Sequence, residues 1–164
     1  MRARAAGVVR VGPVAGDRAA RETEPARVWV FFYGSYMNFD VLGEVDLVPD
    51  RWEVGRLAGF DLRIEPRANL VRADGAVVYG ILATATHAEL GRLYAHAGEV
   101  LGEVYLPEAV LVETLDGTWR AALCCLCPDM EPRPADPDYV ERIAGPARAL
   151  GFPAWYLDRI ESFR

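Results

Sequence analysis

The stretch from Val28 to Met37, VWVFFYGSYM, constrains the fold of this chain more than any other part of it. Large or β-branched apolar residues follow one another without interruption from Val28 to Phe32. An exposed strand would alternate such residues with polar ones, so the run predicts a strand that is buried on both faces.

The residues after this strand predict a turn that is able to bind a ligand. Gly34 lets the backbone turn, and it lets another group approach the main chain closely. The amides that follow leave the sheet ladder and can converge on an anion or a carbonyl oxygen; they belong to Ser35, Tyr36 and Met37. The alternative is a buried strand with a glycine turn that binds nothing, since a single glycine is a weak signal.

Composition restricts the class of function. The chain has 164 residues, of which 52% are hydrophobic and 26% are charged, as expected for one globular domain. The net charge of −6 argues against a nucleic-acid-binding surface, and no apolar run approaches the roughly 20 residues of a membrane helix. All 18 basic residues are arginines, which excludes a lysine nucleophile and Schiff-base chemistry.

The three cysteines, Cys124, Cys125 and Cys127, lie close together in the apolar run Ala121–Cys127. Adjacent cysteines do not form a C-x-x-C metal site, and their odd number does not suggest a disulfide framework. We expect them to act as small apolar residues of a buried strand in a reducing, cytoplasmic setting, with no metal bound.

Two regions differ in their sequence pattern. Residues 1–27 have few large apolar residues and no useful periodicity, so they predict a loosely ordered N-terminal extension, with Val8–Val11 as one option for a short strand. They lack the uninterrupted apolar segment of a signal peptide. Residues 28–164 are expected to form a single domain.

Apolar runs predict more strands within this domain. They lie at Ala68–Val71, Ala76–Ala83, Tyr105–Glu113 and Thr118–Cys127. The stretch Trp52–Arg63 alternates loosely and contains two glycines, so it predicts one or two strands with a bend. Asp74-Gly75 and Asp116-Gly117 stand between neighbouring strands and predict hairpin turns.

Helices are predicted from their caps. Thr86 and Glu89 form a capping box for a helix that runs to about Ala97 and is stopped by Gly98. Shorter signals predict a helix capped by Asn38, one over Tyr139–Leu150 capped by Asp138, and one over Ala154–Ser162. Because the strands are numerous and only one helix falls between them, we expect an α+β fold with a mixed, curled sheet that forms a small partial barrel with a few flanking helices.

Several stretches, taken in order, resemble the γ-glutamylcyclotransferase-like family over about Val28 to Ile160. The family's YGS motif after a buried strand is matched by Tyr33-Gly34-Ser35. The other matching stretches are Gly55–Phe60, Ala68–Leu70, Val77–Gly80, Leu90 with Leu93, Tyr105–Val110, Pro137–Tyr139 and Leu150–Tyr156.

The resemblance implies a cleft at the YGS turn whose backbone amides hold a γ-glutamyl group. The implied reaction is attack of the substrate's α-amine on its own γ-carbonyl, which gives 5-oxoproline and a free amine without a cofactor. We expect substrate contacts from Tyr33, Gly34, Ser35, Tyr36, Met37 and Tyr105. The alternative for Tyr33 and Tyr105 is that they are core aromatics with hydroxyls at the surface.

One family position departs from the pattern in a way that matters for catalysis. The family places a glutamate in an L-D-x-x-E-G stretch, and the matching stretch here, Leu93–Gly98, has Ala97 at the acid position. Losing a general acid or base costs roughly 10²–10⁴ in rate. The candidates for its replacement are Glu99 and the neighbouring His96. The alternatives are that Glu99 is a solvated loop acid and that His96 complements the helix dipole.

Two further departures lie in the turn and on a later strand. Tyr36 stands where the family usually has Asn, so its side chain narrows or reshapes the mouth of the cleft. The family often has a tyrosine on the strand matched by Leu123–Leu126, and this sequence has none there.

Two functions remain open from the sequence. The first is a cyclotransferase that acts on a small γ-glutamyl amine or γ-glutamyl amino compound. The second is an inactive relative that binds an acidic small molecule or a protein partner in the same pocket. The residues indicate no oligomeric state.

Overall fold

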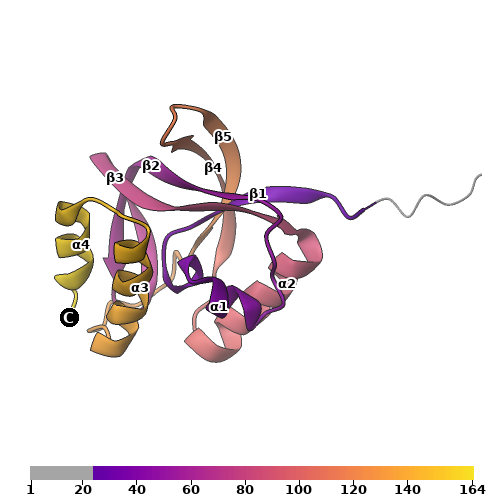
Figure 1. Cartoon of the computed structure of the whole chain (residues 1–164). Helices are drawn as coiled ribbons and strands as arrows, with labels where there is room; N and C mark the ends of the chain where they lie inside the picture. Colours follow the sequence, from indigo (N-terminus) through magenta and orange to yellow (C-terminus); the bar gives the residue numbers. More distant parts are fainter. Residues whose placement is uncertain (1–23) are drawn as a thin grey trace, which may run out of the picture.

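The structure is a computed structural model that describes residues 24–164, and it shows a curled mixed sheet with helices on its flanks (Figure 1). The option of a strand at Val8–Val11 lies outside the described residues. Strand β1 (Arg27–Phe32) is followed by the turn η1 (Ser35–Met37) and helix α1 (Phe39–Gly43). The α+β class predicted from the sequence is confirmed.

The remaining elements follow in the order strands, helix, strands, helices. They are β2 (Trp52–Ile64), β3 (Ala68–Thr86), α2 (His87–His96), the π-helical turn η2 (Ala97–Leu101), β4 (Leu106–Thr114), β5 (Trp119–Leu126), α3 (Pro137–Ala149) and α4 (Ala154–Glu161). None of the helices in residues 24–164 is both long and apolar enough to cross a membrane.

The strands are arranged around the sheet in the order β1-β3-β2-β4-β5. Neighbours in this order pair antiparallel, and β5 returns to pair with β1 in parallel, at Val30 with Leu123 and Phe31 with Cys124. The parallel pair makes the sheet mixed, as predicted, and its return to the first strand curls the sheet into a barrel-like form. Helices α3 and α4 lie together on one side, and α1 and α2 lie on another (Figure 1).

The second half of strand β1 is buried on both faces, as its apolar run predicts, whereas Val28 and Trp29 are only half-buried. Val30 and Phe31 have no exposed surface and Phe32 is 3% exposed. Its contact with β3 is close because Gly80 has no side chain. A Cβ at position 80 would lie 2.3 Å from the carbonyl oxygen of Phe32 and 2.8 Å from the ring of Phe31.

The predicted hairpin at Asp74-Gly75 is wrong. These residues lie inside β3, which runs unbroken from Ala68 to Thr86, and the chain reverses instead between Ile64 and Ala68. Ala58 pairs with Val77 and Phe60 with Arg72, so Gly59 alone faces residues 73–76. Gly75 has φ = 75° and supplies a left-handed residue for this bulge. An Asp-Gly pair serves a bulge as well as it serves a turn.

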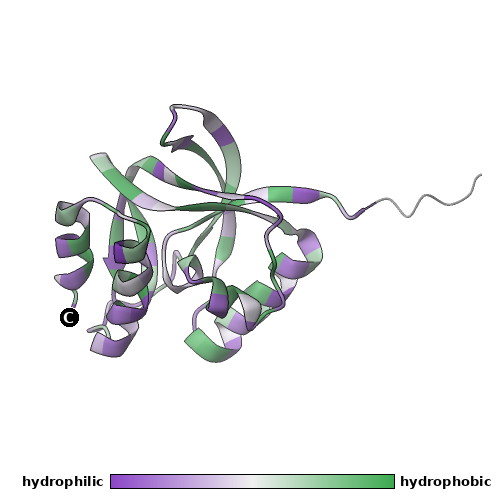
Figure 2. Cartoon of the chain, viewed as in Figure 1, coloured by the Kyte–Doolittle hydropathy of each residue, from purple (hydrophilic) through white to green (hydrophobic). Residues whose placement is uncertain are grey.

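Helix α2 begins with the predicted capping box. The hydroxyl of Thr86 accepts a hydrogen bond from the amide of Glu89 at 3.2 Å, and the Glu89 carboxylate accepts one from the amide of Thr86 at 2.7 Å. Leu90 and Leu93 are buried against the core, as expected for its apolar face. Hydrophobic and hydrophilic residues alternate along this helix and along α3 and α4 (Figure 2).

The ends of two helices differ from prediction. The helical path does not stop at Gly98 but continues through η2 to Gly102, whose φ of 73° provides the left-handed residue that ends it. Helix α3 is capped by Asp136, which accepts from the amide of Asp138 at 2.8 Å, because Pro137 fits the first helical position at no cost in hydrogen bonds.

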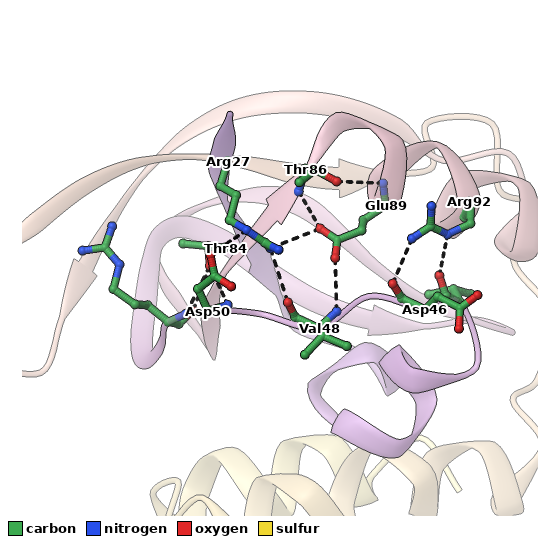
Figure 3. Close-up of polar contacts among 10 residues, drawn as sticks. Arg27, Asp46, Val48, Asp50, Thr84, Thr86, Glu89 and Arg92 are labelled. Atoms are coloured by element: carbon green, nitrogen blue, oxygen red, sulfur yellow. Dashed lines mark hydrogen bonds and ion pairs between the residues drawn. The ribbon is translucent and has the colours of Figure 1, made fainter. Parts of the chain in front are cut away.

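The carboxylate of Glu89 joins three segments of the chain (Figure 3). Besides its bond to Thr86, it accepts from the amide of Val48 at 3.3 Å and from Nη1 of Arg27 at 3.2 Å. Arg27 also lies 2.6 Å from a carboxylate oxygen of Asp50. The start of β1, the start of α2 and the loop between α1 and β2 are thereby held together around a residue that is 8% exposed.

Burial alone raises the pKa of Glu89, but the hydrogen bonds from Thr86 and Val48 and the charge of Arg27 outweigh it, so the pKa is lowered from its usual 4.5. A lowered carboxylate pKa contributes stability above the usual value, and that contribution is lost as the pH falls through the lowered pKa. The carboxylate is therefore stabilising at neutral pH.

Replacing Gly80 tests the contact between β1 and β3. We expect Gly80→Ala to lower the free energy of unfolding by an amount at or above the upper end of the usual overpacking range of about 1–3 kcal/mol, because the added Cβ meets backbone. Gly91→Ala is the control, since position 91 on α2 has open space and alanine favours a helix by about 1 kcal/mol. Urea unfolding measures both. Equal stability of the two variants would contradict the close contact.

Replacing Glu89 tests the three-segment network. We expect Glu89→Gln to lower the free energy of unfolding at pH 7 by about 1–3 kcal/mol, because charge-assisted hydrogen bonds are lost. The loss should shrink as the pH falls from 4.5, where the unfolded carboxyl begins to take up its proton, through the lowered pKa of the native carboxyl. Urea unfolding at a series of pH values measures it, with the exposed Glu131→Gln as control. A loss that stays constant with pH would rule out the charged network.

Candidate functional site

The turn after β1 leaves two backbone amides free. The amide of Met37 donates to the carbonyl of Gly34 at 3.0 Å, and that of Asn38 donates to Ser35 at 3.1 Å. Among residues 24–164, the amides of Ser35 and Tyr36 have no hydrogen-bond partner. Asn38 then caps α1 by accepting from the amide of Asp40 at 2.9 Å, as predicted. The turn thus presents two adjacent donors.

A narrow pocket of about 30 Å³ lies at this turn. Its lining comes from β1, the turn, β3, α2, η2, β5 and α3, and from Tyr105 just before β4. The residues are Phe31, Phe32, Tyr33, Gly34, Ser35, Tyr36, Ala68, Leu93, Ala97, Leu101, Tyr105, Cys125 and Tyr139. Of the predicted contact residues, Met37 alone is absent from this lining; it is buried and faces the cleft between α1 and α3.

The pocket is small for a ligand site, since ligand pockets commonly have about 300–1,000 Å³. The bulky lining residues that are partly exposed, and so stand at its mouth, are Tyr36, Leu101 and Tyr105. The hydroxyl of Tyr36 is hydrogen-bonded to Nδ1 of His96 at 2.9 Å, and the hydroxyl of Tyr105 donates to the carbonyl of Ala68 at 2.6 Å. Leu101 is apolar and packs against the core.

The backbone of Ala68 holds one wall of the pocket in place. Its amide donates to the hydroxyl of Tyr139 at 3.1 Å, and its carbonyl accepts from Tyr105. A Cβ at position 34 would lie 2.8 Å from the Cβ of Ala68. Gly34 is therefore required for packing between the turn and β3, and a substitution there would report on packing as well as on ligand access. The hydroxyl of Tyr33 donates to the carbonyl of Cys125 across the sheet.

The side chains that line the pocket are electrically neutral near pH 7. Burial raises the pKa of Tyr33, Tyr36, Tyr105 and Tyr139 above the usual value of a phenol. Burial also raises the pKa of the Cys125 thiol to about 11, so it is not a thiolate nucleophile. In this uncharged surrounding, the free amides of Ser35 and Tyr36 are available as hydrogen-bond donors.

Ala97, which the sequence resemblance aligns with the family's acid, faces this pocket. Ala97 is fully buried and is part of the lining. Glu99, two residues further on, is exposed and is not part of it. Residues two apart on a helical turn do not face the same side, so Ala97 faces the pocket while Glu99 points away from it.

His96 lies beside the pocket rather than in it. Its Nδ1 atom is 2.9 Å from the hydroxyl of Tyr36, and its Nε2 atom is 3.7 Å from a carboxylate oxygen of Glu44. The rings of Tyr36 and His96 meet edge to face, with centroids 6.1 Å apart. The hydroxyl of Tyr36 therefore links the lining of the pocket to the imidazole of His96 by one hydrogen bond.

Two contributors were missed from the sequence. The sequence predicts Tyr139 only as part of a helix, although the resemblance includes Pro137–Tyr139. An aromatic residue in the first turn of an amphipathic helix is a signal for a buried hydroxyl. Glu44 carries no sequence signal, because its approach to His96 depends on how α1 packs against α2.

The fold can now be compared with that of known proteins. No family profile matches the sequence, and no curated protein sequence matches it either. Among solved structures, one described as a gamma-glutamyl cyclotransferase has a TM-score of 0.71 at 22% identity, over 85% of this chain and 89% of its own. An uncharacterized human protein has a TM-score of 0.72 at 21% identity, over 84% and 88%.

A more distant structure agrees with these two. A yeast gamma-glutamyl cyclotransferase described as specific to glutathione has a TM-score of 0.58 at 13% identity, over 84% of this chain and 95% of its own. At such identities the likeness concerns the fold. The chain has the γ-glutamylcyclotransferase-like fold, which is the fold that the sequence resemblance implied.

Proposed function

We propose that this protein cyclises a small γ-glutamyl compound and releases 5-oxoproline and a free amine. The observation that carries the proposal is the pair of unused amides of Ser35 and Tyr36 at the wall of an uncharged pocket. Attack of the α-amine on the γ-carbonyl places negative charge on the carbonyl oxygen, and two adjacent N–H donors in an apolar site are suited to stabilise it.

Besides stabilising the oxyanion, the protein must position the substrate and transfer one proton. The nucleophile and the carbonyl belong to one molecule, so binding the extended substrate in a bent form supplies much of the rate by proximity. No cofactor is needed for this ring closure. One proton must still pass from the attacking nitrogen to the leaving nitrogen.

Of the two proton carriers suggested by the sequence, we favour His96 over Glu99. His96 contacts a hydroxyl that lines the pocket, at 2.9 Å. Glu99 is exposed on η2 and would have to turn inward past the pocket wall to reach a substrate.

A second function has one specific observation in its favour. Ala97 faces the pocket at the family's acid position, as expected if the pocket binds a γ-glutamyl or similar small molecule without turning it over.

Replacing Ser35 tests the amide pair directly. Proline fits the first position of a helical turn and removes one N–H donor, whereas alanine keeps the donor and removes only the hydroxyl. We expect Ser35→Pro to lower kcat for 5-oxoproline release by about 10²-fold or more, and Ser35→Ala to stay within about threefold of wild type. Thermal unfolding verifies that both are folded. Equal activity of the two variants would remove the Ser35 amide from the mechanism.

Replacing Ala97 separates the two functions. We expect wild type to release 5-oxoproline from γ-glutamylalanine or γ-glutamyl-n-butylamine, with Ala97→Glu changing the rate only modestly because a proton path already exists. Ala97→Gln is the control for added volume. If wild type binds these compounds but is inert, and Ala97→Glu alone gains activity by roughly 10²-fold or more, the binding function is correct.

A further inference from the structure

A path of polar groups leads from the pocket to solvent. Tyr36 lines the pocket, its hydroxyl lies 2.9 Å from Nδ1 of His96, and Nε2 of His96 lies 3.7 Å from the carboxylate of Glu44. The exposed fraction rises outward along this path, from 19% for the His96 side chain to 64% for that of Glu44. The three residues come from η1, the end of α2 and the end of α1.

The order of these groups sets the roles of the two imidazole nitrogens. A carboxylate next to Nε2 favours the tautomer with its proton on that atom, which leaves Nδ1 as an acceptor. The hydroxyl of Tyr36 then donates to Nδ1. If His96 takes up that proton, the nearby Glu44 stabilises the resulting imidazolium.

The other tyrosines of the pocket are engaged differently. The hydroxyls of Tyr33 and Tyr105 donate to backbone carbonyls, and that of Tyr139 accepts from a backbone amide. Carbonyls and amides do not exchange protons at useful rates. Among the tyrosines that line the pocket in the described part of the chain, Tyr36 alone is bonded to a group that readily takes up and returns a proton.

We propose that Tyr36 is the catalytic residue that exchanges the proton with the substrate. His96 acts through it by taking up and returning that proton, and Glu44 positions His96. The inference rests on the proposed cyclisation. Because Tyr36 also contributes one of the two free amides, a single residue would supply an oxyanion donor from its backbone and a proton path from its side chain.

The proton path balances over one turnover. The neutral α-amine forms a C–N bond to the γ-carbon, and its nitrogen passes a proton to the oxygen of Tyr36 while the hydroxyl proton moves to Nδ1 of His96. The proton then returns from Nδ1 through Tyr36 to the leaving nitrogen as its C–N bond breaks. Burial keeps the pKa of Tyr36 above its usual value, so the hydroxyl is protonated at the start and at the end.

Two substitutions test the relay while keeping the shape of the site. Tyr36→Phe keeps the ring and the backbone amide but removes the hydroxyl. His96→Asn keeps an acceptor near the Tyr36 hydroxyl but does not take up a proton. His87→Asn, at an exposed histidine in the first turn of the same helix, is the matched control. The probes are γ-glutamylalanine and γ-glutamyl-n-butylamine, and the readout is kcat and KM for 5-oxoproline release.

We expect Tyr36→Phe and His96→Asn each to lower kcat by about 10²-fold with KM within about threefold of wild type. The double variant should be no slower than Tyr36→Phe alone, because both residues serve one path. Glu44→Gln should lower kcat by less, about fivefold, because its side chain is largely exposed. His87→Asn should leave both constants unchanged.

The outcomes separate the relay from the proposed function. An active wild type whose Tyr36→Phe variant keeps its kcat, or loses only in KM, overturns the relay and leaves cyclisation standing. Additive losses in the double variant also overturn it, because they show independent roles. A wild type that binds the probes but releases no 5-oxoproline overturns cyclisation and the relay together.

Discussion

The buried carboxylate of Glu89 is the interaction on which the arrangement of the site depends. It accepts from Thr86 at the start of α2, from Val48 in the loop after α1, and from Arg27 at the start of β1. Strand β1 leads to the YGS turn, helix α2 leads to His96 at its end, and the loop at Val48 follows the end of α1. A carboxylate taken out of water is stable only when its oxygens are satisfied, so all three partners must be in place at once. Glu89 of the capping box thereby holds together three segments that are far apart in the sequence.

The pocket combines a rigid wall with an uncharged lining. Its backbone is held by glycine contacts and by tyrosine hydroxyls that are bonded to main-chain groups, as at Ala68. The free amides of Ser35 and Tyr36 therefore cannot rotate away from a ligand. Fixed donors in an apolar surrounding act more strongly than the same donors in water, because no solvent reorganises around them. Such a site can serve chemistry on a neutral amide without any charged side chain in contact with it.

Local signals in the sequence predicted much of the fold, and packing decided the rest. The buried strand after Arg27 and the capping box at Thr86 were correct because each depends on neighbouring residues alone. Asp74-Gly75 was misjudged because a bulge and a hairpin use the same backbone conformation, and only the pairing with β2 distinguishes them. The candidate site was likewise predicted where local signals exist and missed where packing decides. The turn was visible in the YGS motif, whereas no composition signal marks the π-helical turn that continues the helix past Gly98 and carries Glu99. The meeting of Tyr36 with His96 joins residues that are distant in sequence.

The parallel pairing of β5 with β1 has a consequence for the order of events during synthesis. Phe31 meets Cys124, so the first strand of the domain waits for a partner that leaves the ribosome only after most of the chain has been made. Strand β3 can pair with β1 earlier, but the other edge of β1 stays open until β5 arrives. Contacts of such long range slow folding, and an open apolar edge can pair with another chain. The same late step brings Cys125 and then Tyr139 to the pocket, so the nascent domain is most exposed to aggregation while its binding site is still incomplete.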